Sequence, residues 1–237
     1  MYQQAKATLL SLFLLAVPVF CLADIIQVVD EDFNEPLNAF FLSPFASENA
    51  TAGITLGNVA GSQGVIYTGT WQISPETTEF SSGLVAPLFP PNTDFQFDPR
   101  EVDGVAAVSY TVDAVLNGFP GDSLNNLFLV LVIYQQNEEG LIDVFSQRGV
   151  TTSVENTTLQ SVTVDLAIND FEDFNGNPPD VGPDGRPFSF GIQLGAQFDD
   201  QTFTGFEQGH LSIDNWEVFV EVPDRIFQDR FEEPPEL

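Results

Sequence analysis

Apolar and polar residues alternate along two stretches of the chain. In residues 105–115 one face carries Ala106, Val108, Tyr110, Val112 and Ala114, and the other carries mainly polar side chains. Residues 159–168 repeat this pattern, with Val, Leu and Ile opposite Ser, Thr and Asp. A period of two with one polar face predicts half-buried β-strands.

A continuous apolar run follows at residues 127–134. The run is short and rich in β-branched residues, so it predicts a central strand that is covered on both faces. Similar reasoning predicts strands at Ile25–Val29, Ile54–Leu56, Val65–Ile73, Leu141–Ser146, Phe188–Ala196 and Leu211–Val222. Clusters of Gly, Pro, Asn and Asp separate these segments, and no amphipathic helix exceeds two turns. About ten strands without a helical period predict an all-β sandwich or barrel.

Composition restricts the function. Hydrophobic residues make up 43% of the 237 residues, which is enough for a real core. The formal net charge is -29, from 35 acidic and 6 basic residues. This charge excludes ordinary nucleic-acid binding, which needs clustered Lys and Arg, and it disfavours docking on anionic lipid.

The first 23 residues resemble an export signal rather than part of the fold. Lys6 precedes an apolar run over 7–20, and Ala23 precedes acidic Asp24. This order predicts a cleaved signal peptide, and the run is too short for an ordinary membrane span. We therefore expect a secreted protein, extracellular or at the outer cell surface, without a transmembrane segment after processing. An uncleaved anchor is the alternative. Cleavage would remove Cys21, the chain's one cysteine, and leave no disulfides.

Three motifs occur in a familiar order: Glu31-Asp32-Phe33-Asn34, the alternating strand at 160–166, and a last strand that contains Ile213-Asp214-Asn215-Trp216. Over residues 24–222 this order resembles extracellular jelly-roll β-sandwich modules of the carbohydrate-binding, galactose-binding-like or concanavalin-like type. The resemblance implies an antiparallel jelly roll and leaves these topologies open.

The end of the chain, from residue 223 to residue 237, is expected to be an acidic tail outside the sandwich. Residues 226–232 resemble the Ile-Phe-x-Asp-Gly-Phe-Glu endings of Gram-negative secreted proteins, with Arg230 where Gly is usual. This resemblance implies a role in export or surface retention. A frayed terminus is the alternative.

Catalytic chemistry finds little support. His210 is the one histidine, and it is expected at a turn or strand edge, so nucleophilic triads and zinc sites are disfavoured. Concanavalin-like glycosidases often carry Glu-x-Asp-x-x-Glu on one strand. Glu101 and Asp103 begin that pattern, but Ala106 stands where the second Glu belongs. The sequence therefore favours a non-catalytic protein.

A long loop over residues 169–187 suggests calcium. Asp173, Asn175, Asn177, Asp180 and Asp184 supply oxygen ligands at close spacing among flexible glycines. We predict a structural Ca²⁺ there. The family resemblance suggests a second pair, Asp32 and Asp214, and a solvated acidic loop is the alternative to both.

Ligand binding is assigned to Tyr67 and Trp71, which lie four residues apart and hence on one face of a strand. They either stack on sugar rings or fill the core. The prediction is a secreted, non-catalytic module that binds a polysaccharide or matrix glycan at the cell surface. The alternatives are a structural or adhesive surface protein without a small ligand, and a polysaccharide-cleaving enzyme on a concanavalin-like fold. The oligomeric state stays open.

Overall fold

The computed structural model describes residues 24–34, 40–74, 78–87, 96–117, 127–147, 158–198 and 205–223. The predicted signal peptide and nearly all of the predicted tail, from residue 224 on, lie outside these residues. Within the described ranges we find no helix long and apolar enough to cross a membrane.

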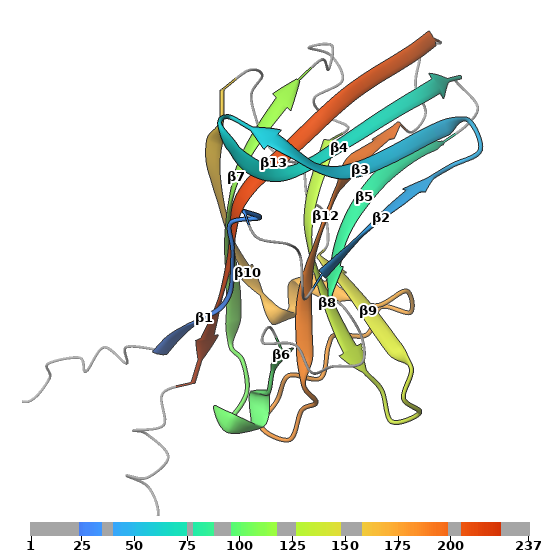
Figure 1. Ribbon diagram of the computed structural model, residues 1–237. Coiled ribbons are helices and arrows are strands. Elements are labelled where there is room, and N and C mark those ends of the chain that lie inside the picture. The colour runs from blue at the N-terminus through green and yellow to red at the C-terminus, as the bar shows by residue number, and fades with distance from the viewer. Residues whose placement is uncertain are drawn as a thin grey trace, which may run out of the picture.

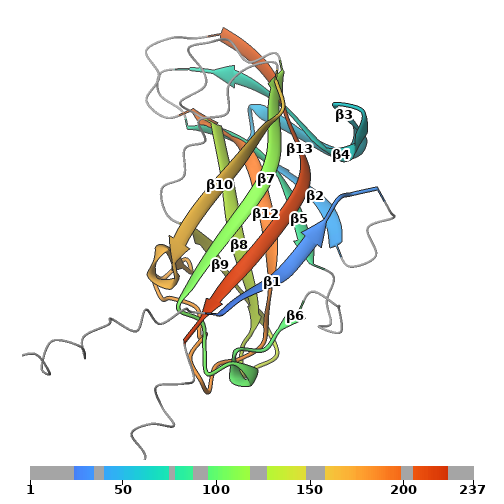
Figure 2. The same ribbon diagram turned by 90° about the vertical axis from the view of Figure 1, so that its left-hand side faces the viewer.

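Sheet A is one layer of the sandwich (Figures 1 and 2). Its hydrogen-bonded order is β10-β7-β13-β4-β3, and β1 also pairs with β13. All these pairs are antiparallel. The strands are β1 (Asp24–Glu31), β3 (Ala50–Val59), β4 (Ser62–Ile73), β7 (Ala107–Asn117), β10 (Gln160–Ala167) and β13 (Gly205–Val222).

Sheet B is the second layer, in the order β11-β9-β8-β12-β5-β2, and β6 also pairs with β12. Its strands are β2 (Phe40–Ala46), β5 (Glu79–Pro87), β6 (Gln96–Phe97), β8 (Leu127–Gln136), β9 (Ile142–Gln147), β11 (Phe171–Glu172) and β12 (Phe188–Phe198). The helical elements of the described residues are short 3-10 turns, η1 (Pro99–Glu101) and η3 (Ile168–Asp170). The prediction of an all-β antiparallel jelly-roll sandwich is confirmed.

A bulge divides the long strand β13. Residues up to Ile213 pair with β4, whereas residues from Trp216 onward pair with β1. Between them the register with β7 shifts, and Asn215 has a positive φ of 48°, a conformation that Asn tolerates well. The Asn215 amide donates to Asp113 Oδ2 at 2.8 Å. The Ile-Asp-Asn-Trp motif thus marks the point where β13 changes partners.

The core fills the space between the inner faces of the two sheets. Trp71 packs edge-on against Phe198 with centroids 5.2 Å apart, and Trp216 lies 5.4 Å from Phe40. The buried hydroxyl of Tyr110 donates to the Leu129 carbonyl at 3.2 Å. These contacts join strands of sheet A to strands of sheet B, and burial of such large aromatic surfaces is a main source of stability in a chain of this kind.

Several strands are longer than the sequence predicted, and β2, β5, β6 and β11 were missed. Pro44 interrupts β2, and proline is tolerated there because β2 is an edge strand. In β5 small residues replace the usual β-formers, as in Ser81-Ser82-Gly83. Both sequences therefore lack the simple apolar alternation by which the other strands were found.

Candidate functional site

The two rings predicted to bind sugar, Tyr67 and Trp71, do share one face of β4, but that face points into the core. Both side chains are 0% exposed. Gly69 lies between them, and any Cβ there would collide with both rings. The Tyr67 hydroxyl donates to the Ser81 carbonyl of sheet B at 2.8 Å, and burial raises the pKa of Tyr67. Both residues therefore fill the core, which was the alternative to sugar stacking, because neither ring has an open face for a ligand.

The predicted calcium ligands divide into two groups. Asp173 Oδ1 accepts the backbone N–H groups of Asn175 and Asn177, both at 2.8 Å, and Asp173 Oδ2 accepts the Asn177 amide at 3.0 Å. These bonds, led by the Asn177 side chain, lower the pKa of Asp173. The Asp180 carboxylate instead lies 3.5 Å from Arg186 Nε.

Hydrogen bonds from a buried side chain of β8 hold the rest of the loop. The buried Gln135 side chain donates to the carbonyls of Asp180 and Arg186, both at 2.7 Å, and accepts the Asp180 N–H at 2.9 Å. Asp184 stays exposed at the surface. Among the described residues no group of three or more His, Cys, Asp or Glu side chains gathers to hold a metal. Calcium at this loop stays a prediction.

The alternative calcium pair is placed as follows. Asp32 is exposed and accepts the Asn34 N–H at 3.0 Å, and this bond lowers the pKa of Asp32. Asp214 is buried in β13, where it accepts the Ser62 hydroxyl and the Asn215 N–H.

The residues considered for catalysis, Glu101 and Asp103, do not form a pair of acids on one strand. Glu101 ends η1 and Asp103 occupies the following turn with a positive φ of 60°. They therefore do not alternate along one strand as the glycosidase pattern requires. His210 lies within β13 between Thr68 and Asn117, rather than at the predicted turn or edge.

A different surface stands out: the outer face of sheet B. Alternation along β2, β5, β12 and β8 turns one set of side chains away from the core. We call this set the neutral face, because none of its members is charged. They are Phe41, Ser43, Phe45, Phe80, Ser82, Leu84, Ala86, Phe128, Val130, Val132, Tyr134, Ser189, Gly191, Gln193, Gly195 and Gln197.

The middle of the neutral face is a second apolar cluster, separate from the core. It contains Ala86, Val130, Val132 and Tyr134, with Leu84 and Phe128 packed against them. Two glycines of β12 leave room for aromatic rings. A Cβ at Gly195 would lie 2.8 Å from Phe128 Cζ, and one at Gly191 would lie 2.7 Å from Tyr134 Cε2. The β8 rings therefore lie over the backbone of β12, where the glycines have no side chains.

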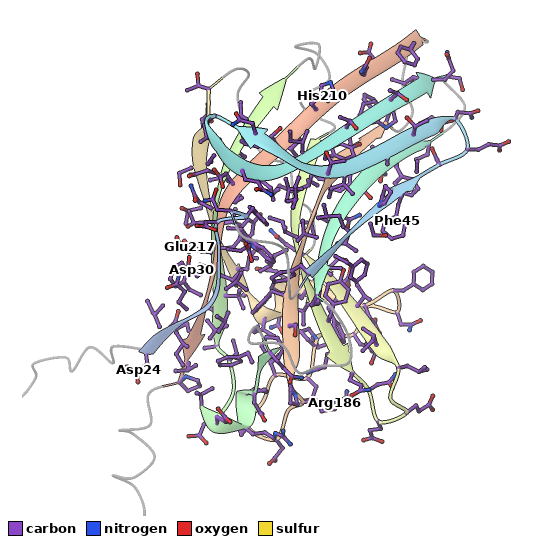
Figure 3. The ribbon with its side chains drawn as sticks, viewed as in Figure 1. Asp24, Asp30, Phe45, Arg186, His210 and Glu217 are labelled. Atoms are coloured by element: carbon purple, nitrogen blue, oxygen red, sulfur yellow. The ribbon has the colours of Figure 1, made fainter. Side chains whose placement is uncertain are left out.

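The rim of the neutral face is exposed on β2. Phe41 and Phe45 are 43% and 48% exposed, with Ser43 between them on the same side. Figure 3 shows Phe45 at one side of the sandwich, opposite Asp30 and Glu217. Phe45 is opposite Ser82, which accepts a hydrogen bond from the Gln193 amide at 3.0 Å. Aromatic rings thus adjoin hydroxyl and amide groups, a combination typical of ligand sites.

The sequence did not predict this face, because β2 and β5 lack the simple apolar alternation that marks the other strands. The spacing Phe41-x-Ser43-x-Phe45 was a usable signal, since alternate residues of a strand share a side. The partners of these residues on β5, β12 and β8 are distant in sequence, so only the sheet order brings them together.

Comparisons with known proteins give structural likenesses only. No protein-family model matches the sequence, and no curated protein matches it either. Among solved structures, the family 11 carbohydrate-binding module of the cellulase Lic26A-Cel5E from Clostridium thermocellum is 11% identical, with a TM-score of 0.44 over 85% of this chain and 96% of that chain.

Two further likenesses are of the same order. The solution structure of CtCBM11 is 10% identical, with a TM-score of 0.46 over 85% of this chain and 97% of that one. The xylanase Xyn10B from Clostridium thermocellum, solved as its CBM22-1 and GH10 modules, has a TM-score of 0.41 at 10% identity and covers 84% of this chain and 29% of that one. The architecture described above rests on the strand pairing of this chain itself.

Proposed function

We propose that this chain is a secreted, non-catalytic β-sandwich module that binds a neutral polysaccharide or matrix glycan on the neutral face of sheet B. The observation that carries the proposal is the absence of charge from the described part of this face, in a chain with a formal net charge of -29. A surface kept apolar, aromatic and uncharged in so acidic a chain is typical of an interaction site.

The chemistry of the face suits a sugar chain. A pyranose ring presents C–H groups on its faces and hydroxyl groups around its edge. Phe41 and Phe45 offer apolar ring faces, while the Ser43 hydroxyl and the Gln193 amide offer hydrogen-bonding groups. The described residues of this face include no cation that would favour a uronate or sulfated glycan.

The face also lacks the groups that hydrolysis requires. Its described residues include no carboxylate or imidazole, and burial raises the pKa of Tyr134 further above neutrality. Glycoside cleavage needs two carboxyl groups across the scissile bond. The neutral face therefore favours binding without cleavage.

A structural or adhesive protein without a small ligand is the second candidate. It is favoured by the position of Phe41 and Phe45 on β2, an edge strand of sheet B. Exposed aromatic residues at an edge can pack against another protein as well as against a sugar.

The test is a glycan array on the exported protein, followed by affinity measurements with soluble oligosaccharides. Useful first ligands are a β-1,3-1,4-mixed-linked tetrasaccharide and xylohexaose, with which a family 11 module from Clostridium thermocellum and the Xyn10B modules were solved. We expect neutral glycans to bind and acidic glycans not to. Phe45→Ala should weaken binding by about fivefold to tenfold, the typical contribution of one aromatic contact.

Phe206→Ala is the matched control, because Phe206 is an exposed phenylalanine on sheet A. Equal losses in both variants, or no glycan that binds, would overturn the proposal. Self-association that Phe45→Ala removes would support the adhesive candidate instead. N-terminal sequencing of the exported protein tests secretion, since cleavage before Asp24 is the expected result.

A further inference from the structure

A shallow trough lies on the outer face of sheet A, on the side of the sandwich opposite the neutral face. Its volume is about 340 Å³. Its walls come from β10, β7, β13 and β1, which lie side by side in Figure 2. The lining residues are Ile25, Ala107, Val108, Ser109, Asp165, Leu166, Ala167, Phe219 and Glu221.

Strand register explains why the sheet is hollowed there. Ser109 pairs with Asp165 on one side and with Phe219 on the other, and Ala107 pairs with Ala167 and Glu221. The middle strand β7 therefore contributes two small side chains, and longer side chains stand on the neighbouring strands. The small side chains of Ala107 and Ser109 therefore form the low floor of the trough.

The walls combine apolar surface with negative charge. Ile25 is 70% exposed, and Phe219 is partly exposed beside it. Asp165 and Glu221 stand on opposite sides of β7 and are offset by two residues in register. The lining includes no basic residue, and each of these carboxylates lacks a salt bridge among the described residues. The trough thus combines a floor of small side chains, apolar walls and two carboxylates without salt bridges in the described part of the chain. These features complement a ligand in which positive charges lie next to an apolar group.

We propose that this trough binds an extended segment of a partner protein in which two basic residues flank an apolar residue, with one residue of spacing on each side. The Cα atoms of Asp165 and Glu221 are separated by two strand spacings and one two-residue step, about 12 Å. In an extended peptide, residues i and i+4 are about 13 Å apart and share a side with residue i+2. The basic side chains thus reach the two carboxylates while the apolar one lies over Ala107 and Ser109.

This inference is independent of the proposed function, because the trough and the neutral face lie on different sheets. It gives the module two contacts, one for a neutral ligand and one for a basic peptide. Two surface ion pairs bind weakly, so avidity or a larger surrounding contact would supply the rest of the affinity.

The experiment titrates the end-capped peptide Gly-Lys-Ser-Leu-Ser-Lys-Gly into isotopically labelled protein while amide chemical shifts are recorded. We expect shifts at residues 107–109, 165–167 and 219–221, and binding that weakens as salt screens the charges. Asp165→Asn and Glu221→Gln should each weaken binding by about fivefold, and their combination should abolish it. Ser109→Leu, which fills the trough without changing charge, should also block binding.

Two controls make the result specific. The peptide Gly-Lys-Lys-Leu-Ser-Ser-Gly has the same composition with the wrong spacing and should bind more weakly. Asp30→Asn with Glu48→Gln removes two negative charges outside the trough and should leave binding unchanged. Equal loss in this double variant, or unchanged binding in the Asp165 and Glu221 double variant, would overturn the proposal. A variant that lacks residues 224–237 provides a further test, without added peptide. Changes in the amide chemical shifts of the trough in this variant would also overturn the proposal, because the chain's own end would then be the occupant.

Discussion

The outer faces of the two sheets differ in chemistry although they belong to one small sandwich. On sheet A the outward side chains include Asp30, Asp113, Asp165, Glu217 and Glu221, with threonines between them. On sheet B the described outward positions of the four strands of the neutral face carry no charge and several are aromatic, and by register the outer face of this sheet carries Glu172 on β11. The negative charge of the chain is thus unevenly distributed.

This difference separates the acidic surface of sheet A from the face that we propose binds a ligand. Charges on sheet A add to the repulsion between copies of the chain, since the net charge is far from zero. The neutral face can then expose Phe41 and Phe45 to a ligand. The middle of the same face is a tightly packed apolar cluster.

The largest effect is expected from a charge placed in the middle of the neutral face. Val132 is 1% exposed in the outer apolar cluster, so Val132→Asp would bury an unpaired carboxylate. We expect a loss of about 3–5 kcal/mol in the free energy of unfolding, measured by urea denaturation. The matched change on sheet A, Thr163→Asp at an exposed position, should cost less than about 1 kcal/mol. Similar costs for both variants would mean that the two faces do not differ in packing.

A smaller loss of stability is expected when a glycine of β12 that lies under a β8 ring is replaced. A Cβ at Gly195 would meet Phe128 and the Ser81 carbonyl oxygen, and a backbone atom cannot move aside easily. Gly195→Ala should therefore destabilise by about 1–3 kcal/mol and displace the Phe128 ring.

The control is Gly57→Ala on sheet A, where the nearest atom is the flexible end of the Ile66 side chain, 2.6 Å away. It should cost less than about 1 kcal/mol. The interpretation of the neutral face as a close-packed platform requires this order and fails if the two costs are reversed.

Charge repulsion on sheet A should produce a still smaller effect of opposite sign. Asp30 and Glu217 pair directly across β1 and β13, and like charges in this position destabilise a sheet. Asp30→Asn should stabilise the protein by about 0.2–1 kcal/mol at low ionic strength, and the gain should vanish near 1 M salt. Glu48→Gln, on the turn before β3, is the control and should change stability less. A gain that persists at high salt would have a cause other than charge.

The smallest effect concerns acid and the turn at residues 173–177. The hydrogen bonds from Asn177 and Asn175 lower the pKa of Asp173, so the turn is stabilised when Asp173 is ionised. That contribution is present above the ordinary carboxyl pKa and is lost as pH falls through the lowered pKa of the folded state. An acid titration should therefore shift the amide signals of Asn175 and Asn177, and Asp173→Asn should remove this dependence.

Asp184→Asn, elsewhere in the same loop, should leave that titration unchanged. A double variant of the same loop tests calcium. A rise in melting temperature with Ca²⁺ but not with Na⁺ of equal ionic strength, lost in Asp173→Ala with Asp180→Ala, would support the predicted site. Equal effects of the two salts would mean that this loop is an acidic surface screened by any cation.

The sequence predicted strands best where one face alternates. β7 and β10 lie within two residues of their predicted bounds, because burial of one face imposes a period of two, and β8 was found equally well from its continuous apolar run. It failed for β2 and β5, where Pro44, Ser82 and Gly83 obscure the period. These two strands carry Phe41, Phe45 and Phe80, so the candidate site was lost together with them.

The predicted sugar-binding residues on β4 show the same limit of sequence reasoning. Period two correctly placed Tyr67 and Trp71 on one side of the strand. It could not say whether that side faced solvent, because the position of sheet B decides this, through Ser81 and Phe198 packed against the two rings. Periodicity reports which residues share a face, and packing determines which face is inside.

The sequence by itself determined the all-β class and the strong acidity, since these follow from local period and composition, and the antiparallel sandwich was implied by the family resemblance. Tertiary structure alone decided the rest. It aligned β2, β5, β12 and β8 into one neutral face, and it turned Asp165 and Glu221 toward a common trough. These sites join residues that are far apart along the chain, and their neighbours are set by sheet order and register, which no local pattern encodes.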